Sequence, residues 1–137
     1  MVILALAMSV GACSSGDPAT RTLAALEGFN TTTQQAYRAI PRPLTVDGCH
    51  AYVTALIAAS RTQADAIRTI DYPDAVDAEV AHYLSLSDEA LAILDTALAS
   101  STLEDCFGQV LEFVHKDTEI GDSTGVLREL LGLPTLD

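Results

Sequence analysis

The chain has 137 residues, the length of one ordinary domain. Apolar residues make up 49% of it, but only 5% is aromatic and Trp is absent, and this alanine- and leucine-rich composition favours helices over strands. With 19 acidic against 7 basic residues and a net charge of −12, the chain lacks the clustered Lys and Arg that neutralise phosphates, which argues against a nucleic-acid partner.

An apolar segment from Val2 to Val10 opens the chain and is followed by small residues and a cysteine. The segment is too short to span a bilayer, which takes about 20 residues, but it has the length of a signal-peptide core. The residues Val10-Gly11-Ala12-Cys13 resemble the lipobox of bacterial lipoproteins. The resemblance implies that residues 1–12 are a signal peptide and that the sulfur of Cys13 carries a covalent lipid. It covers only the leader and these four positions, so it indicates a processing route and no specific family for the mature domain.

One feature of the leader departs from the lipoprotein pattern. No Lys or Arg precedes Cys13, the first base being Arg21, whereas signal peptides begin with a basic region. Either translation starts upstream of Met1, or the leader is weak; a third interpretation is a buried N-terminal helix with an incidental cysteine. The linker-like residues 14–17 favour the lipobox. Residues 13–17 are then the lipidated cysteine with a short linker, and residues 18–137 form a single domain that faces the periplasm or the exterior.

The predicted domain contains amphipathic helices whose starts carry recognisable signals. Asp17 and Pro18 suit the cap and first position of a helix that runs to Ile40, where Pro41 stops it. A second helix is predicted after Thr45 and a third from Pro73 to about Leu98.

A fourth helix is predicted to open with a capping box from Ser101 to Glu104 and to end at Gly121 as a left-handed cap. A short leucine-rich helix over about 124–131 then closes the chain. The short connections predict an all-α, up-down-up-down four-helix bundle with this short C-terminal helix added.

Cys49 and Cys106 remain as a pair once Cys13 is assigned to the lipid. Export places them in an oxidising compartment, so we expect a disulfide, with two buried free thiols as the alternative. The second and fourth helices run parallel, which puts both cysteines at the same end of the bundle. These helices are diagonal in a square bundle, however, so a bridge requires a rhombic arrangement, for which Gly48 and Gly108 would allow a close approach.

Two motifs resemble catalytic patterns but lie in the wrong context. Glu79-x-x-His82 and Glu112-x-x-His115 are spaced as in ferritin-like di-iron proteins, yet helical phase places them away from the apolar stripes. Residues 121–125 fit the G-x-S-x-G nucleophile elbow, which needs a preceding strand, so Ser123 is interpreted as a helix cap. We therefore predict no catalytic residue and favour a non-enzyme.

Three weaker features remain. A polar layer interrupts the apolar stripes and indicates either close helix packing or a small pocket; its members are Asn30, Thr33, Ser60 and Ser87. An acidic collar is expected towards the anchored end, as a solvated surface, a membrane-repelling one or a divalent-cation site; it comprises Asp71, Asp74, Asp117, Glu119 and Asp122. Leu86 and Ile93 lie off their stripe and are expected to pack on the C-terminal leucines or on a partner protein.

The sequence thus predicts an anchored lipoprotein of the bacterial cell envelope whose domain is a non-catalytic interaction or assembly module. Its expected partners are the lipid bilayer, through the anchor, and an envelope protein. No cofactor is predicted besides the lipid on Cys13. The alternative is a helical bundle that binds a small ligand or a metal.

Overall fold

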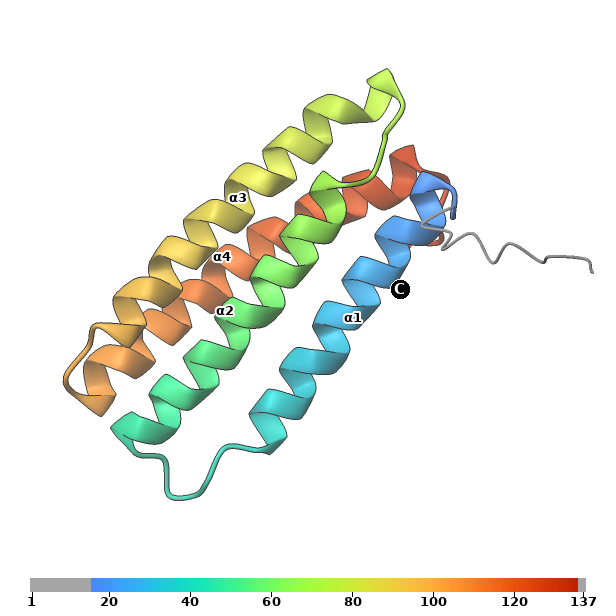
Figure 1. The fold of residues 1–137 in the computed structure, drawn as a ribbon. Coiled ribbons are helices and arrows are strands. Elements are labelled where there is room, and N and C mark those ends of the chain that lie inside the picture. The colour runs from blue at the N-terminus through green and yellow to red at the C-terminus, as the bar shows by residue number, and fades with distance from the viewer. Residues whose placement is uncertain (1–15, 136–137) are drawn as a thin grey trace, which may run out of the picture.

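The computed structural model describes residues 16–135, which form helices joined by short connections (Figure 1). The helices are α1 (Pro18–Arg38), α2 (Val46–Arg68), α3 (Asp74–Leu98) and α4 (Leu103–Leu130), and successive helices run in opposite directions. This part of the chain contains no strand, so the predicted all-α class is confirmed. None of these helices is both long and apolar enough to cross a membrane. The predicted leader and Cys13 lie outside the described residues.

Side-chain caps set where three of the helices begin. Asp17 Oδ1 accepts from the Thr20 N–H at 2.8 Å, and Thr45 Oγ1 accepts from the Gly48 N–H at 3.1 Å, as predicted. The cap of α4 is Thr102 rather than Ser101: its hydroxyl accepts from the Asp105 N–H at 3.1 Å and donates to the Asp105 carboxylate at 2.8 Å. The helix starts one residue late because Thr102 and Asp105 repeat the spacing of the predicted capping box.

The C-terminal end of α4 contradicts the prediction. The helix does not stop at Gly121 but continues to Leu130, so the predicted short helix is its last part. Gly121 keeps a helical backbone, and burial of Leu127, which is fully enclosed, offsets the roughly 1 kcal/mol that a mid-helix glycine costs. The left-handed glycine is Gly132, with φ 68°; beside it the Leu133 N–H donates to the Arg128 carbonyl at 2.8 Å in a Schellman motif.

The central helix of the bundle is α2, which packs against α1, α3 and α4. The helices α3 and α4 pack most extensively on each other, and α1 lies along the outer side of α2 (Figure 1). As a result α1 buries only Thr22 and Leu26, while Leu23 and Phe29 stay half-buried.

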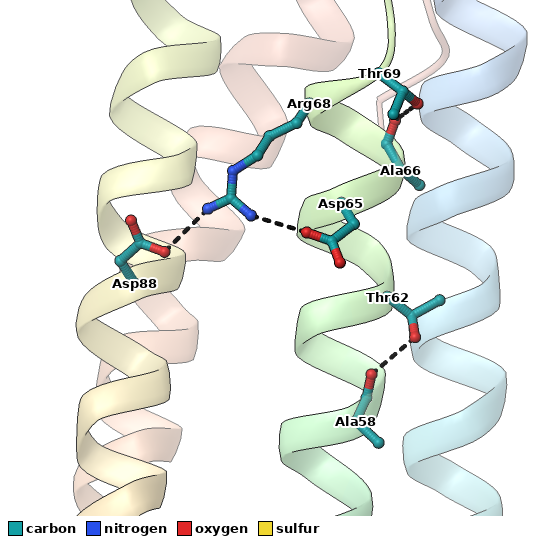
Figure 2. Close-up of polar contacts among 7 residues, drawn as sticks. All are labelled: Ala58, Thr62, Asp65, Ala66, Arg68, Thr69 and Asp88. Carbon is teal, nitrogen blue, oxygen red and sulfur yellow. Dashed lines mark hydrogen bonds and ion pairs between the residues drawn. The ribbon is translucent and has the colours of Figure 1, made fainter.

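Ion pairs add little to this packing. Figure 2 shows Arg68 of α2 reaching Asp88 on α3 at 3.1 Å while it also contacts Asp65 at 3.1 Å. All three side chains are exposed, and exposed pairs contribute about 0–1 kcal/mol. The ion pairs of Arg68 therefore add little to the contact between α2 and α3.

The predicted disulfide joins Cys49 to Cys106, with a Cα–Cα distance of 6.5 Å. It lies where α2 and α4 contact each other across the diagonal of the bundle. The predicted role of the glycines is wrong. A Cβ on Gly108 would meet nothing within 4 Å, and the nearest neighbours of one on Gly48 would be Thr45, Leu44 and Pro41 at ordinary contact distances, none of them on α4. The close approach belongs to the helix arrangement itself, in which α2 packs against both α3 and α4 while α1 packs mainly on α2.

Candidate functional site

A half-open cavity of about 240 Å³ lies between α1, α2 and α4. Its α1 and α4 residues recur at three- and four-residue spacing, so each helix turns one face towards the space. We call it the α1–α4 cavity. It is lined by Leu23, Leu26, Glu27, Phe29 and Asn30 of α1, Gln63 of α2, and Asp117, Ile120, Gly121, Thr124 and Arg128 of α4.

Gln63 is the polar group that α2 contributes to the cavity wall. Its side chain is 9% exposed, and its Oε1 accepts a hydrogen bond from Tyr83 Oη at 2.6 Å. Tyr83 is fully buried, and this burial raises the pKa of its phenol, so the hydroxyl stays protonated and donates. The bond holds the Gln63 amide in place. Its Nε2 has no acceptor among residues 16–135 and is not sealed from solvent, and the Gln63 side chain lines both this cavity and a second depression between α1 and α2.

Arg128 forms the positively charged end of the cavity. The residue is 7% exposed, and its Nε donates to the Pro134 carbonyl at 2.7 Å, which pins the C-terminal tail against α4. A guanidinium carries five N–H donors, and the remaining ones find no acceptor within the described part of the chain. Arg128 therefore presents a cation that is held in place and whose remaining donors have no acceptor among residues 16–135.

Asp117 forms the opposite end. It lies 11 residues before Arg128, which corresponds to about 16 Å along α4. Its carboxylate makes no hydrogen bond or ion pair with any described residue, and Glu27 lines the cavity from α1. The Asp117 side chain stays exposed to solvent, yet the protein packed around it removes part of its hydration, which raises the pKa of this carboxyl above its ordinary value. The cavity thus has an acidic and a basic end.

Replacing Asp117 with Asn is expected to raise the melting temperature at pH 7. The pKa of Asp117 is raised in the folded state, so its negative charge lowers the free energy of unfolding at every pH above the folded pKa. This destabilisation is lost as the pH falls from the folded pKa through the ordinary value of 3.8. The difference in melting temperature between the variant and the native chain should therefore disappear at about pH 3. Thermal melts of both proteins across this range test it, with Glu129→Gln, an exposed change on the same helix that also removes one negative charge, as the control. A lower melting temperature at pH 7, or a gain that persists in acid, contradicts the prediction.

The predicted polar layer is not a single layer. Ser60 and Ser87 are buried, Thr33 is half-buried, and Asn30 is exposed and alone among the four lines the cavity. The hydroxyls of Thr33 and Ser87 bond to backbone carbonyls four residues earlier, both at 3.0 Å. The buried polar groups that matter here, Gln63 and Arg128, were missed. Helical phase gave a signal for Gln63, because it lies between Ser60 and Ile67 on the apolar stripe of α2.

The acidic collar residues are not gathered at one place. Asp71 and Asp74 are exposed at the connection between α2 and α3, and Asp117 lines the α1–α4 cavity. Glu119 pairs with Lys116 at 2.8 Å and lies with Asp122 in a different surface depression. Among residues 16–135 no three His, Cys, Asp or Glu side chains are placed to hold a metal ion together.

The serine of the G-x-S-x-G pattern lies in the middle of α4 and is not a helix cap. Ser123 is 4% exposed and donates to Glu79 Oε1 at 2.5 Å, which ties α4 to α3. Glu79 is thus half-buried rather than outward-facing. His82, Glu112 and His115 are exposed, as helical phase predicted.

An apolar stripe on α4 is exposed. It consists of Phe107, Leu111 and Val114, whose exposed fractions are 47%, 49% and 52%. Their spacing of four and three residues places them on one face of the helix. Leu86, by contrast, is buried, and Ile93 packs against the core. The apolar stripe that is exposed to solvent therefore lies on α4, and not at Leu86 and Ile93 of α3, where the sequence suggested one.

Comparison with protein families, with curated proteins and with solved structures finds no match. The function must be argued from the chemistry of the surfaces themselves. Those surfaces are the α4 stripe and the α1–α4 cavity.

Proposed function

We propose that this chain is a lipid-anchored protein of the bacterial cell envelope whose helical domain is a non-catalytic interaction module. The residues Val10-Gly11-Ala12-Cys13 support the anchor, and Cys13 precedes the first helical residue, Pro18, by only a short linker. Each buried CH₂ contributes about 0.8 kcal/mol, so two or three acyl chains hold a protein stably on a membrane. The net charge of −12 supports a domain that stands off an anionic lipid surface.

The observation that carries the interaction role is the exposed stripe of Phe107, Leu111 and Val114. Exposed apolar side chains that share one helix face are typical of protein-interaction surfaces. Glu104 and Glu112 are exposed on the same helix, in a chain with 19 acids and 7 bases. Charge complementarity therefore favours a partner that presents a basic, amphipathic segment.

Replacing Cys13 with Ser tests the anchor. The native chain is expected to fractionate with membranes, and the variant is expected to be soluble, because serine has no thiol to receive the lipid. Mass spectrometry of the native N-terminal peptide should show the added acyl chains. The Cys49→Ala, Cys106→Ala variant is the control and should stay with the membranes. A Cys13→Ser protein that sediments as the native chain does would contradict the proposal.

A photo-crosslinking residue at Leu111 tests the partner in intact cells with the anchor retained. It should capture one defined protein that the same group placed at Thr54, exposed on α2, does not capture. The purified partner should bind the native domain at least tenfold more tightly than a Phe107→Ser, Leu111→Ser variant, because two apolar contacts are lost. Equal capture from both positions, or equal binding by both proteins, would overturn the interaction role of the stripe.

A second candidate function, small-ligand binding, is favoured by a different observation. The α1–α4 cavity holds the buried polar groups of Gln63 and Arg128 with donors that have no acceptor in the described chain. Pockets with a few oriented polar groups between apolar walls are typical ligand sites.

A further inference from the structure

We propose that the α1–α4 cavity binds a short peptide of about three residues with free termini. The proposal rests on the second candidate function, small-ligand binding, and names its ligand class. Three features carry it: opposite charges at the two ends, a buried amide donor between them, and apolar walls.

The acidic end suits the peptide ammonium group. Asp117 has no cation within ion-pair distance among the described residues, and Glu27 of α1 adds a second carboxylate to the cavity lining. An ammonium supplies three donors and a positive charge to carboxylates placed in this way. A chain with a net charge of −12 also draws a positively charged group towards itself.

The basic end suits the peptide carboxylate. Arg128 is held by its Nε bond to the Pro134 carbonyl, so its guanidinium does not need to be ordered by the ligand. Its other N–H groups, which have no acceptor in the part of the chain that the structure describes, form the planar fork that pairs with two carboxylate oxygens. Thr124, one turn before Arg128, adds a hydroxyl to the same end of the cavity.

The middle of the cavity selects a peptide over a simple amino acid. Gln63 Nε2 needs an acceptor between the charged ends, and a peptide carbonyl supplies one. Asp117 and Arg128 both line the cavity from α4, about 16 Å apart along the helix, and the lengths of the two side chains reduce the gap to be bridged to the order of 10 Å. Three extended residues span roughly 10 Å. The walls of Leu26, Phe29 and Ile120 suit small apolar side chains.

Calorimetric titration of the purified domain with tri-alanine, N-acetyl-tri-alanine and tri-alanine amide tests the proposal. Free tri-alanine is expected to bind, and each capped peptide is expected to bind at least tenfold more weakly, because each lacks one terminal charge. Asp117→Asn should weaken binding of free tri-alanine at least tenfold and leave binding of the acetylated peptide unchanged. Capped peptides that bind as well as the free one would overturn the assignment of the ends.

A matched pair of glycine variants places the ligand in this cavity. Gly121 and Gly108 both lie within α4, and a Cβ at either meets nothing within 4 Å, but only Gly121 lines the cavity. Gly121→Leu is expected to abolish binding and Gly108→Leu to leave it unchanged, with native circular dichroism in both. Tri-alanine binding that survives in folded Gly121→Leu protein would overturn the location.

Hexanoate and hexylamine, titrated in the same way, separate the peptide proposal from the function on which it rests. Suppose that either probe binds the native domain but not the Gly121→Leu variant, while tri-alanine does not bind. The peptide proposal is then overturned, and small-ligand binding by the cavity stands. If none of the probes binds at millimolar concentration, both are overturned.

Discussion

A variant with both Cys49→Ala and Cys106→Ala is expected to unfold with a free energy about 4 kcal/mol below that of the native chain. The bridge joins residues separated by 57 positions, and loop-closure arithmetic assigns about 4 kcal/mol to a loop of this length. It also fastens the diagonal contact between α2 and α4. For a domain of this size the loss corresponds to a fall in melting temperature on the order of 15 °C. Thermal unfolding followed by circular dichroism measures it.

The reductant provides the control for this prediction. The native chain melted with excess dithiothreitol should behave as the double variant does, and the double variant should not respond to the reagent. Alanine is chosen because both cysteines are almost fully enclosed, and a serine hydroxyl there would be buried without a partner. A fall of less than about 3 °C would show that the folded state does not depend on the bridge.

Leu94→Ala is expected to lower the free energy of unfolding by about 3 kcal/mol. Leu94 is fully enclosed in the cluster that contains Val53, Leu56 and Phe113. Truncation removes buried methyl groups and leaves a cavity that close-packed neighbours fill only partly, which costs about 2–5 kcal/mol. Urea denaturation gives the change, and the m-value should stay constant.

The matched control is Leu98→Ala, one turn later on α3. Leu98 is 37% exposed, so the same chemical change creates no enclosed cavity and should cost less than about 1 kcal/mol. Similar losses at both positions would contradict the core described for α3.

The helices could be predicted because their determinants lie within a few residues of one another. Asp17 and Thr45 cap α1 and α2 as their local sequence predicts. The error at Gly121 has a non-local origin. Glycine favours a helix end locally, but α4 continues because Leu127 must reach the cluster formed with Ile67 and Val76.

The disulfide could be predicted from the sequence, but the residues of the α1–α4 cavity could be predicted only in part. Counting cysteines identified the Cys49–Cys106 pair, because the reasoning needs only their number and compartment. Helical phase shows which side chains face inward, but not whether another helix comes to cover them. Asn30 was therefore predicted in the core and lies at a cavity, while Arg128, on a segment predicted as a separate helix, was overlooked.

The sequence alone determined the class of the fold, the four helix starts to within a residue and the cysteine pairing, because capping and a 3.6-residue period act over one or two turns. The tertiary structure decided where α1 lies. Its distance from α4 depends on how all the helices share the surface of α2, so no local pattern encodes it. That placement opens the α1–α4 cavity, brings Gln63, Asp117 and Arg128 to one space, and leaves the α4 stripe exposed.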